Sequence, residues 1–457
     1  MVANAAKEYP MKNHPWNRRE FIARPLTWFA AARLLKNPEF LFAEQASSAP
    51  GAAARKPLYR PLGKTGISLP VISMGVGKTE IAALVRRSYE LGVRYFDTAA
   101  SYAQGQNEVM LGSMIKVIGV RDKVVIATKV HMPIAMNQSS AALTSAQLRD
   151  AMQDTLDASL KRMQLDYVDI VLLHAASSAE NVKSEGVLEA MNAWKKAGKA
   201  RFIGVSSHSQ QQEVLTAVTE LGVHDVVMFG FNRTMASNRG LLEAMDAAYK
   251  KGIGLVTMKS LAGGVPGSEA PGQGGGQGGA QGPRGGPPQA GAEGGGAPQM
   301  QSPPGGSQSA SATNPTALIK WVLQHESIAT VISAFGTFEQ VEQNFSVAYD
   351  LSYTDSERKF ISDEKLVSQL EYCQQCGKCR SSCPTRADIP TLMRSHMYAL
   401  QYRDLEKSSY ALASIPKGKG LDACANCDIC PASCVNTVNI ARKIAELKTL
   451  PFPVTNV

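Results

Sequence analysis

The chain has 457 residues, of which 44% are hydrophobic and 19% charged, so it is long enough to bury a large core in more than one domain. No run of 18 uncharged apolar residues occurs, which argues against a membrane-spanning helix. The formal net charge is +9, but residues 1–60 hold 10 Lys and Arg against 4 Asp and Glu, which accounts for +6 of it. Because the basic excess lies mostly in an N-terminal arm, the charge does not indicate a nucleic-acid binder.

Residues 1–57 have the pattern of a targeting segment followed by a linker. Paired arginines, Arg18 and Arg19, precede a short apolar stretch from Leu26 to Ala32, and a run rich in Ala, Ser and Pro follows at Ala46–Ala54. This order resembles a twin-arginine export signal, the route taken by already folded proteins, and predicts a periplasmic location. The alternative is a basic amphipathic arm on a cytoplasmic protein.

From Leu58 onward, short β-branched runs alternate with helical patterns such as Thr144–Met163 and Ser237–Lys251. Eight strands with intervening helices predict a (β/α)₈ barrel, here over residues 58–350. A doubly wound sheet is the alternative, but none of the eight successive strand–helix units contains a Gly-x-Gly-x-x-Gly fingerprint. The predicted strands are Val71–Gly75, Arg94–Asp97, Val124–Lys129, Val168–His174, Ala200–Ser206, Val226–Phe231, Gly254–Lys259 and Thr330–Ser333.

A glycine- and proline-rich insertion follows the seventh predicted strand. Residues 262–312 contain 18 Gly and 8 Pro in 51 positions and almost no large apolar side chains. Such a segment cannot offset its own chain entropy, so it is expected to be disordered. It is interpreted either as a mobile lid over a cofactor or as a tolerated surface insertion.

Four polar residues stand at or just beyond predicted strand ends: Asp97, Tyr102, Lys129 and His174. Strand carboxyl ends converge on one pocket in a barrel, which makes these residues neighbours. Tyr102 has a proton to donate, and a nearby Lys129 ammonium would lower its ordinary pKa of about 10. Asp97 is suited to hold Lys129, and His174 to orient a substrate oxygen or relay a proton. Each alone has a structural alternative, such as a packed aromatic ring, a surface ion pair or a core imidazole.

The segment 58–350 resembles the aldo/keto reductase family. The resemblance implies that Asp97, Tyr102, Lys129 and His174 match the family's catalytic tetrad. It also implies hydride transfer between NAD(P)H and a small carbonyl or alcohol, with Tyr102 as the proton donor. The stretches that carry the resemblance are Tyr59–Gly66, Gly92–Ala99, Ala127–Lys129, Leu165–Asp169, Leu172–His174, Gly204–Ser206, Met258–Gly264 and Glu339–Asn344.

The cofactor contacts implied by the resemblance match less completely than the tetrad. Ser207 stands where the family usually has Asn, and Met228 where it often has Gln. Gly336 stands where relatives often carry an arginine for the 2′-phosphate of NADP, so the choice between NADP and NAD stays open. The candidate cofactor-binding residues are Ser206, Ser207, Lys259, Leu261, Gln340 and Asn344.

All eight cysteines lie in the C-terminal region, residues 351–457. They form two sets with the spacing Cys-x₂-Cys-x₂-Cys-x₃-Cys, which resembles a bacterial-type ferredoxin domain with two [4Fe–4S] clusters. A pair of zinc sites is the alternative. Between the sets, 392–407 is predicted to be helical and to pack on the barrel. The resemblance implies crossed ligand sets: Cys373, Cys376, Cys379 and Cys434 for one cluster, and Cys424, Cys427, Cys430 and Cys383 for the other.

Two functions follow from this combination. The first is an iron–sulfur aldo/keto reductase, in which the clusters supply or drain electrons for the barrel and exchange them with a redox partner. The second is an electron-transfer protein whose barrel is a scaffold or docking module without nicotinamide chemistry. The complete tetrad favours the first function, and the altered residues Ser207, Met228 and Gly336 favour the second.

Overall fold

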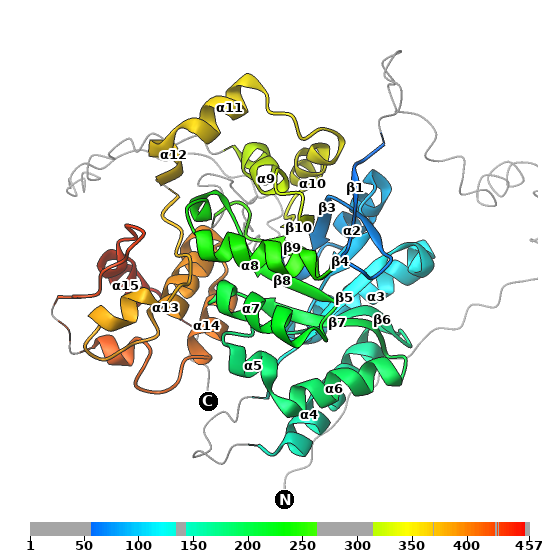
Figure 1. Cartoon of the computed structure of the whole chain (residues 1–457), viewed down its shortest axis with the longest axis horizontal. Helices are drawn as coiled ribbons and strands as arrows, with labels where there is room; N and C mark the ends of the chain where they lie inside the picture. Colours follow the sequence, from blue (N-terminus) through cyan, green and yellow to red (C-terminus); the bar gives the residue numbers. More distant parts are fainter. Residues whose placement is uncertain are drawn as a thin grey trace, which may run out of the picture. The chain divides into compact units, whose positions relative to one another are not determined.

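The computed structural model describes residues 56–133, 143–262 and 314–452, apart from residues 369, 426 and 428 (Figure 1). The predicted export segment, 1–57, lies almost wholly outside the described residues, and so does the insertion, 262–312, beyond its first residue. None of the described helices is both long and apolar enough to cross a membrane.

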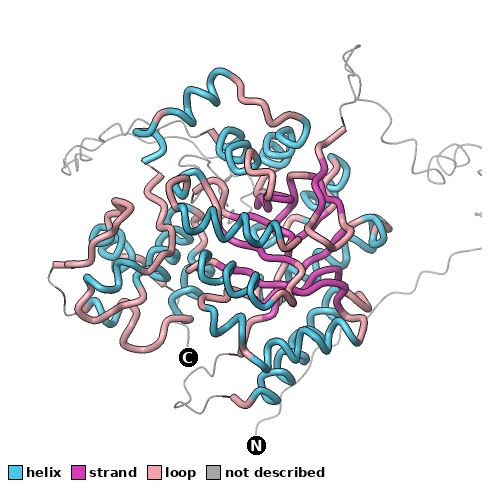
Figure 2. Tube along the Cα trace, viewed as in Figure 1, coloured by secondary structure: helices cyan, strands magenta, loops and turns pink. Residues whose placement is uncertain are grey.

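Eight parallel strands close into a barrel in the order β10-β3-β4-β5-β6-β7-β8-β9 (Figures 1 and 2). The predicted (β/α)₈ fold is therefore confirmed, and the doubly wound alternative is wrong. Each predicted strand is present, with ends that differ by two residues at most. The strands are β3 (Ile72–Gly75), β4 (Tyr95–Asp97), β5 (Val125–Val130), β6 (Val168–Leu173), β7 (Ala200–Ser207), β8 (Val226–Gly230), β9 (Gly254–Met258) and β10 (Ile328–Ala334).

Alternating side chains along each strand build two apolar layers. On β6, Ile170 and Leu172 belong to a cluster inside the barrel, whereas Val171 and Leu173 pack outward against the helices. Every residue of β6 is buried as a result. The surrounding helices are α2 (Ala82–Leu91), α3 (Gln106–Ile118), α4 (Ser145–Met163), α5 (Ala179–Lys183), α6 (Glu185–Lys196), α7 (Gln211–Leu221), α8 (Arg239–Lys250), α9 (Pro315–Leu323) and α10 (Phe338–Ser346).

An antiparallel hairpin of β1 (Tyr59–Pro61) and β2 (Ser68–Pro70) precedes the barrel. Leu62 and Leu69 from this hairpin pack in the inner cluster with Tyr95 and Val226, which are the first residues of their strands. The hairpin thereby closes the amino-terminal end of the barrel. The carboxyl ends of the strands, where barrel active sites form, lie at the opposite end.

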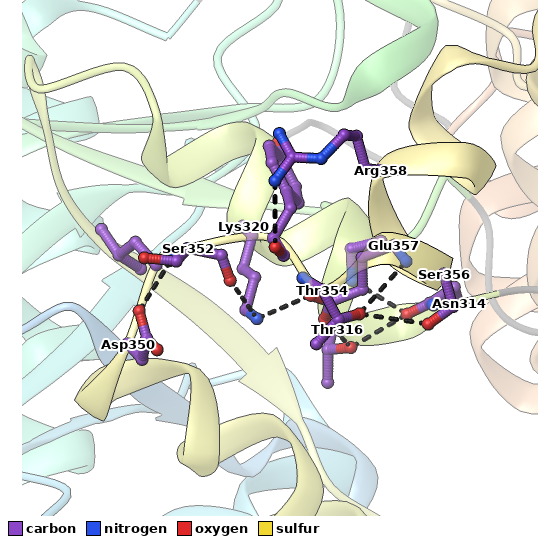
Figure 3. Close-up of polar contacts among 12 residues, drawn as sticks. Asn314, Thr316, Lys320, Asp350, Ser352, Thr354, Ser356, Glu357 and Arg358 are labelled. Carbon is purple, nitrogen blue, oxygen red and sulfur yellow. Dashed lines mark hydrogen bonds and ion pairs between the residues drawn. The ribbon is translucent and has the colours of Figure 1, made fainter.

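Helix α11 (Asp355–Ser362) follows the barrel and is fastened to α9 by a polar cluster (Figure 3). The Lys320 ammonium donates to the Glu357 carboxylate at 2.7 Å and to the Ser352 carbonyl at 2.8 Å. Thr316 donates to the other Glu357 oxygen at 2.6 Å. Because Lys320 and Glu357 are 7% and 4% exposed, their charges depend on each other.

Replacing Lys320 by Met should leave the Glu357 carboxylate buried without its counter-charge. We expect a loss of about 3 kcal/mol in stability, because removing one partner of a buried ion pair costs far more than removing a surface charge. The midpoint of denaturation, followed by circular dichroism, measures this loss. Lys359→Met, at an exposed position of α11, is the matched control and should leave the midpoint nearly unchanged.

The C-terminal region has its own small core, built from residues such as Ala387, Leu392, Ile440 and Leu447. The single helical segment predicted at 392–407 is wrong, because the chain turns at Arg403, whose φ is +52°, and Asp404 then caps a new helix. The helices of this region are α12 (Glu364–Ser368), α13 (Ile389–His396), the π-helical turn η8 (Met397–Gln401), α14 (Leu405–Ala413) and α15 (Ile440–Lys448).

Candidate active site and cluster centre

The structure brings the four predicted tetrad residues together at the carboxyl ends of β4, β5 and β6. Asp97 ends β4, Lys129 lies one residue before the end of β5, and His174 directly follows β6. Tyr102 opens a short 3₁₀ turn, η3 (Tyr102–Gly105), after β4. The Lys129 ammonium donates to Asp97 Oδ2 at 2.5 Å and lies 3.3 Å from the Tyr102 hydroxyl.

The charge on Lys129 is maintained inside the barrel by its neighbours. Burial lowers the pKa of Lys129, but the Asp97 carboxylate and the Tyr102 hydroxyl raise it by more, so the pKa lies above its ordinary value. A further hydrogen bond to the Thr98 carbonyl at 2.7 Å completes the coordination of the ammonium. Tyr102 therefore faces a permanently charged donor.

His174 is held in its neutral form. Its ring meets the Tyr102 ring edge-on, with centroids 5.8 Å apart, and stacks on His131 at 4.0 Å. Burial, followed by the charges of His131 and Lys129, holds the pKa of His174 well below its ordinary range. Its buried Nδ1 has no hydrogen-bond partner among the described residues.

Two cations flank the Tyr102 ring. Lys129 Nζ lies 4.8 Å from the ring centroid, and Lys407 Nζ, from α14 of the C-terminal region, lies 5.0 Å from it. Gly77 permits this position of the ring, because a Cβ at residue 77 would approach the ring to 2.6 Å. Sequence reasoning missed Lys407, since its segment shows only a helical pattern.

The predicted cofactor residues lie on the strands and helices of the same barrel, but they differ in whether their polar groups are free to bind a cofactor. Ser206 Oγ donates to the Leu173 carbonyl at 3.2 Å, and Ser207 Oγ donates to the Ser209 carbonyl at 2.6 Å. Both hydroxyls are therefore engaged within the protein. Met228, at the position where the family often has Gln, packs inside the barrel.

The other predicted cofactor residues lie on the last two units of the barrel. Lys259 follows β9 with a φ of +60°, and Leu261 is partly buried against the outer core. Gln340 and Asn344 lie one turn apart on α10, where Gln340 Oε1 accepts from the Gly336 amide at 2.8 Å. Of these residues, Lys259 offers a charged group toward the barrel end.

The C-terminal region lies across the carboxyl end of the barrel. From the sequence, we predicted only that residues 392–407 pack on the barrel, without saying at which end. Gln374 Nε2 donates to the Thr234 carbonyl at 2.7 Å, and the Gln210 amide donates to the Gln375 carbonyl at 3.2 Å. The buried Tyr372 hydroxyl lies 3.4 Å from the position that a Cβ on Gly230 would take. The residues around the first cysteine therefore contact the ends of β7 and β8.

Electrostatic interactions among the cysteines are compatible with the predicted crossed sets, and the ligation itself stays a prediction. Burial raises the pKa of the Cys373 thiol to about 12, so this thiol is inert until a metal displaces its proton. Ser433 N donates to Ser382 Oγ at 3.0 Å and joins the two cysteine motifs. Electrostatic interactions link Cys373 with Cys376, Cys379 and Cys434, and Cys424 with Cys383, Cys427 and Cys430.

The spacing of the thiols fits a cluster better than a single metal ion. Within the described ranges, no three His, Cys, Asp or Glu side chains are gathered closely enough to hold one ion. A tetrahedral zinc would need its four sulfurs within about 4 Å of one another. The spacing of the cysteines along the chain, Cys-x₂-Cys-x₂-Cys-x₃-Cys, is that of ligands to [4Fe–4S] clusters.

Comparisons with known proteins agree with both parts of this description. The Aldo/keto reductase family model matches residues 72–273, and a 4Fe-4S dicluster domain model matches residues 372–439. L-galactose dehydrogenase from Arabidopsis thaliana is 24% identical over 67% of this chain and 93% of its own length. L-glyceraldehyde 3-phosphate reductase from Escherichia coli K12 is 25% identical over 69% of this chain and 94% of its own. Aldo-keto reductase YhdN from Bacillus subtilis is 33% identical over 36% of this chain and 51% of its own.

The family matches coincide with the two sites built above. The first covers the strands that carry Asp97, Lys129 and His174, and the second covers all eight cysteines. Residues 72–273 are therefore an aldo/keto reductase domain and residues 372–439 a 4Fe–4S dicluster domain, and the chain is an oxidoreductase of the aldo/keto reductase type with an iron–sulfur domain.

Proposed function

We propose that the barrel reduces a small carbonyl compound to an alcohol, and oxidises the alcohol in reverse, with NADPH or NADH as the hydride donor. The observation that carries this proposal is the contact of the charged Lys129 with the Tyr102 hydroxyl at 3.3 Å. Bound nicotinamide supplies two electrons as a hydride to the carbonyl carbon. Tyr102 supplies the proton to the carbonyl oxygen, which balances the reaction.

Each tetrad residue has a defined part in this proton transfer. Lys129 stabilises the phenolate that Tyr102 becomes when it gives up its proton, and Asp97 keeps Lys129 charged and in place. His174, being neutral, can hydrogen-bond the carbonyl oxygen through its ring without adding a second charge. Of the predicted cofactor residues, Lys259 is the best placed to hold the nucleotide, because the Ser206 and Ser207 hydroxyls and Gln340 Oε1 are engaged within the protein and Asn344 is buried.

The relatives suggest the class of substrate. L-galactose dehydrogenase and L-glyceraldehyde 3-phosphate reductase are named for a sugar and for a triose phosphate, and each matches this chain over about two thirds of its length. A short hydroxylated aldehyde, or the corresponding alcohol, is therefore the first substrate to test.

The dicluster domain supports a second redox activity. We propose that the two crossed cysteine sets each hold one [4Fe–4S] cluster, which stores one electron. Two clusters together can hold two electrons. This is the number of electrons that one hydride transfer in the barrel moves. Tyr372, next to Cys373, lies against Gly230 at the barrel end and supports a coupling between the two centres.

The test is carbonyl reduction by the anaerobically purified holoprotein. Glyceraldehyde is supplied with NADPH or NADH, and loss of the reduced nucleotide is followed by absorbance with the clusters oxidised or chemically reduced. We expect nucleotide oxidation that depends on the aldehyde. If neither nucleotide binds or is oxidised, the barrel is instead a scaffold for an electron-transfer protein, the alternative favoured by the residues Ser207, Met228 and Gly336.

A neutral His174 leads to an expectation for the pH dependence of this reaction. The pKa of His174 is held well below its ordinary value, chiefly by burial, so the ring keeps a single proton and stays uncharged at the pH of about 6.5 where a free imidazole titrates. We therefore expect kcat/KM for aldehyde reduction to show no titration near pH 6.5 as the pH falls through that value. A loss of activity near pH 6.5 that His174→Gln removes would contradict this expectation.

A further inference from the structure

We propose that the iron–sulfur domain completes the active site with an anion-binding surface, so that the substrate is a small carbonyl compound carrying a carboxylate or phosphate group. The surface consists of Arg394 on α13 and Lys407 on α14, opposite Lys259 of the barrel. This inference rests on the proposed carbonyl reduction and names its substrate class.

The first observation is that the three cations converge on one buried ring. Lys407 Nζ lies 5.6 Å from the ring centroid of Tyr398. Lys259 Nζ, which comes from the barrel, lies 5.5 Å from the same centroid. Lys407 also lies 5.0 Å from the centroid of Tyr102. Arg394 acts electrostatically on both Tyr398 and His174. The cations therefore lie between the tetrad and the domain that covers it.

The second observation is that these charges have no carboxylate partner, although the Cys373 thiol acts electrostatically on Lys259. Among the described residues, no carboxylate lies within ion-pair distance of Lys259, Arg394 or Lys407, although twenty ion pairs are formed elsewhere. Half-buried cations that repel one another destabilise the protein unless an anion neutralises them.

The third observation is a pocket beside Lys259 and Arg394, which Lys407 and the tetrad do not line. Tyr372, Lys443 and the predicted cluster ligand Cys373 also line it, and its one acidic residue, Glu371, is already paired with Arg442 and Lys443. The buried Tyr372 hydroxyl and His174 Nδ1 have no hydrogen-bond partner in the described parts of the chain. Cations and unsatisfied polar atoms together are the chemistry that carboxylate and phosphate groups require.

The position of the cations determines which part of the substrate they hold. Both Lys129 and Lys407 lie over the Tyr102 ring, at 4.8 Å and 5.0 Å from its centroid, but of the two only Lys129 also contacts the hydroxyl, at 3.3 Å. The carbonyl group therefore belongs at Tyr102 and His174, and the anionic group belongs one or two carbon atoms away, toward Arg394 and Lys407. A barrel without the iron–sulfur domain lacks this half of the site.

The experiment compares three aldehydes in the full holoprotein: neutral glyceraldehyde, glyceraldehyde 3-phosphate and the carboxylate glyoxylate. We expect kcat/KM for one charged aldehyde to exceed that for glyceraldehyde at least tenfold, and the better one identifies the anionic group. In Lys407→Met and Arg394→Met this ratio should fall about tenfold or more, with Lys407→Arg retaining most of it. Lys417→Met, an exposed change in the same region, is the control.

Binding of inorganic phosphate and malonate, measured by calorimetry, is independent of turnover. If no aldehyde is reduced but Arg394→Met and Lys407→Met weaken anion binding at least tenfold, the anion site stands and the proposed reaction fails. If the holoprotein prefers the neutral aldehyde, or if the variants raise the KM for NADPH equally with all three aldehydes, the cations do not recognise the substrate and the inference is overturned.

Discussion

Tyr102→Phe is expected to lower kcat for carbonyl reduction about a thousandfold or more while the nucleotide still binds. Among the described residues, the Tyr102 phenol is the one group with a transferable proton that contacts the Lys129 ammonium, at a distance of 3.3 Å. Positioned general acids contribute about 10²- to 10⁴-fold to rates, and a phenylalanine ring keeps the packing but has no proton to give. The loss should appear in kcat, because the hydroxyl acts mainly in the transition state.

Steady-state kinetics under anaerobic conditions measure this change, and calorimetry with NADPH reports binding in the same variant. Tyr95→Phe is the matched control, since the Tyr95 hydroxyl is buried inside the same barrel without a hydrogen-bond partner. That variant should keep wild-type kcat. A Tyr102→Phe enzyme that retained a tenth of its activity would show that another group gives the proton.

Cys383→Ser is expected to remove one whole cluster, so that iron falls from about eight to about four atoms per chain. The structure gathers Cys383 with Cys424 and not with its sequence neighbours Cys373 and Cys376. Serine keeps the size of the side chain but is a poor ligand for this iron, and a cubane that lacks one corner is lost or degraded.

Double variants separate crossed from uncrossed ligation. With crossed sets, Cys383→Ser combined with Cys427→Ser still costs one cluster, whereas Cys383→Ser combined with Cys376→Ser costs both. Uncrossed sets give the reverse result. Iron content and electron paramagnetic resonance of the reduced proteins after anaerobic reconstitution measure the number of clusters in each variant.

Much of the barrel could be predicted because each strand is recognised from the pattern of its own few residues. Each strand is a short β-branched run buried on both faces, as in Val168–Leu173, and a parallel barrel fixes where such strands end. Asp97, Lys129 and His174 follow as neighbours once their strands are recognised. The tetrad was thus found without any knowledge of its side-chain contacts.

The parts that the sequence did not reveal depend on long-range packing. The hairpin β1–β2 is two short strands whose role appears only when Leu62 meets Val226 inside the barrel. The break at Arg403 was missed because a left-handed residue other than glycine leaves no clear pattern. In the sequence, Lys407 and Arg394 have the pattern of ordinary cations on a helix surface. Their position near the tetrad becomes visible only in the folded structure.

The C-terminal region adds charged and aromatic side chains to the end of the barrel that carries the tetrad. A barrel alone offers Lys259 as the charged group at its open end, whereas the covered barrel also has Arg394, Tyr398 and Lys407 around the tetrad. The first cluster set begins directly after Tyr372, which touches the barrel end at Gly230. The tetrad and the first cysteine set therefore lie at the same end of the barrel.

Transfer of deuterium from NADPH that carries deuterium at both C4 positions of the nicotinamide tests the central claim most directly. The holoprotein is incubated anaerobically with the labelled nucleotide and a carbonyl substrate, and the alcohol is analysed by mass spectrometry. Hydride transfer assisted by Tyr102 predicts one deuterium on the former carbonyl carbon and an exchangeable proton on its oxygen. An alcohol without deuterium, or no alcohol while both clusters remain bound, would contradict the account and leave the barrel without nicotinamide chemistry.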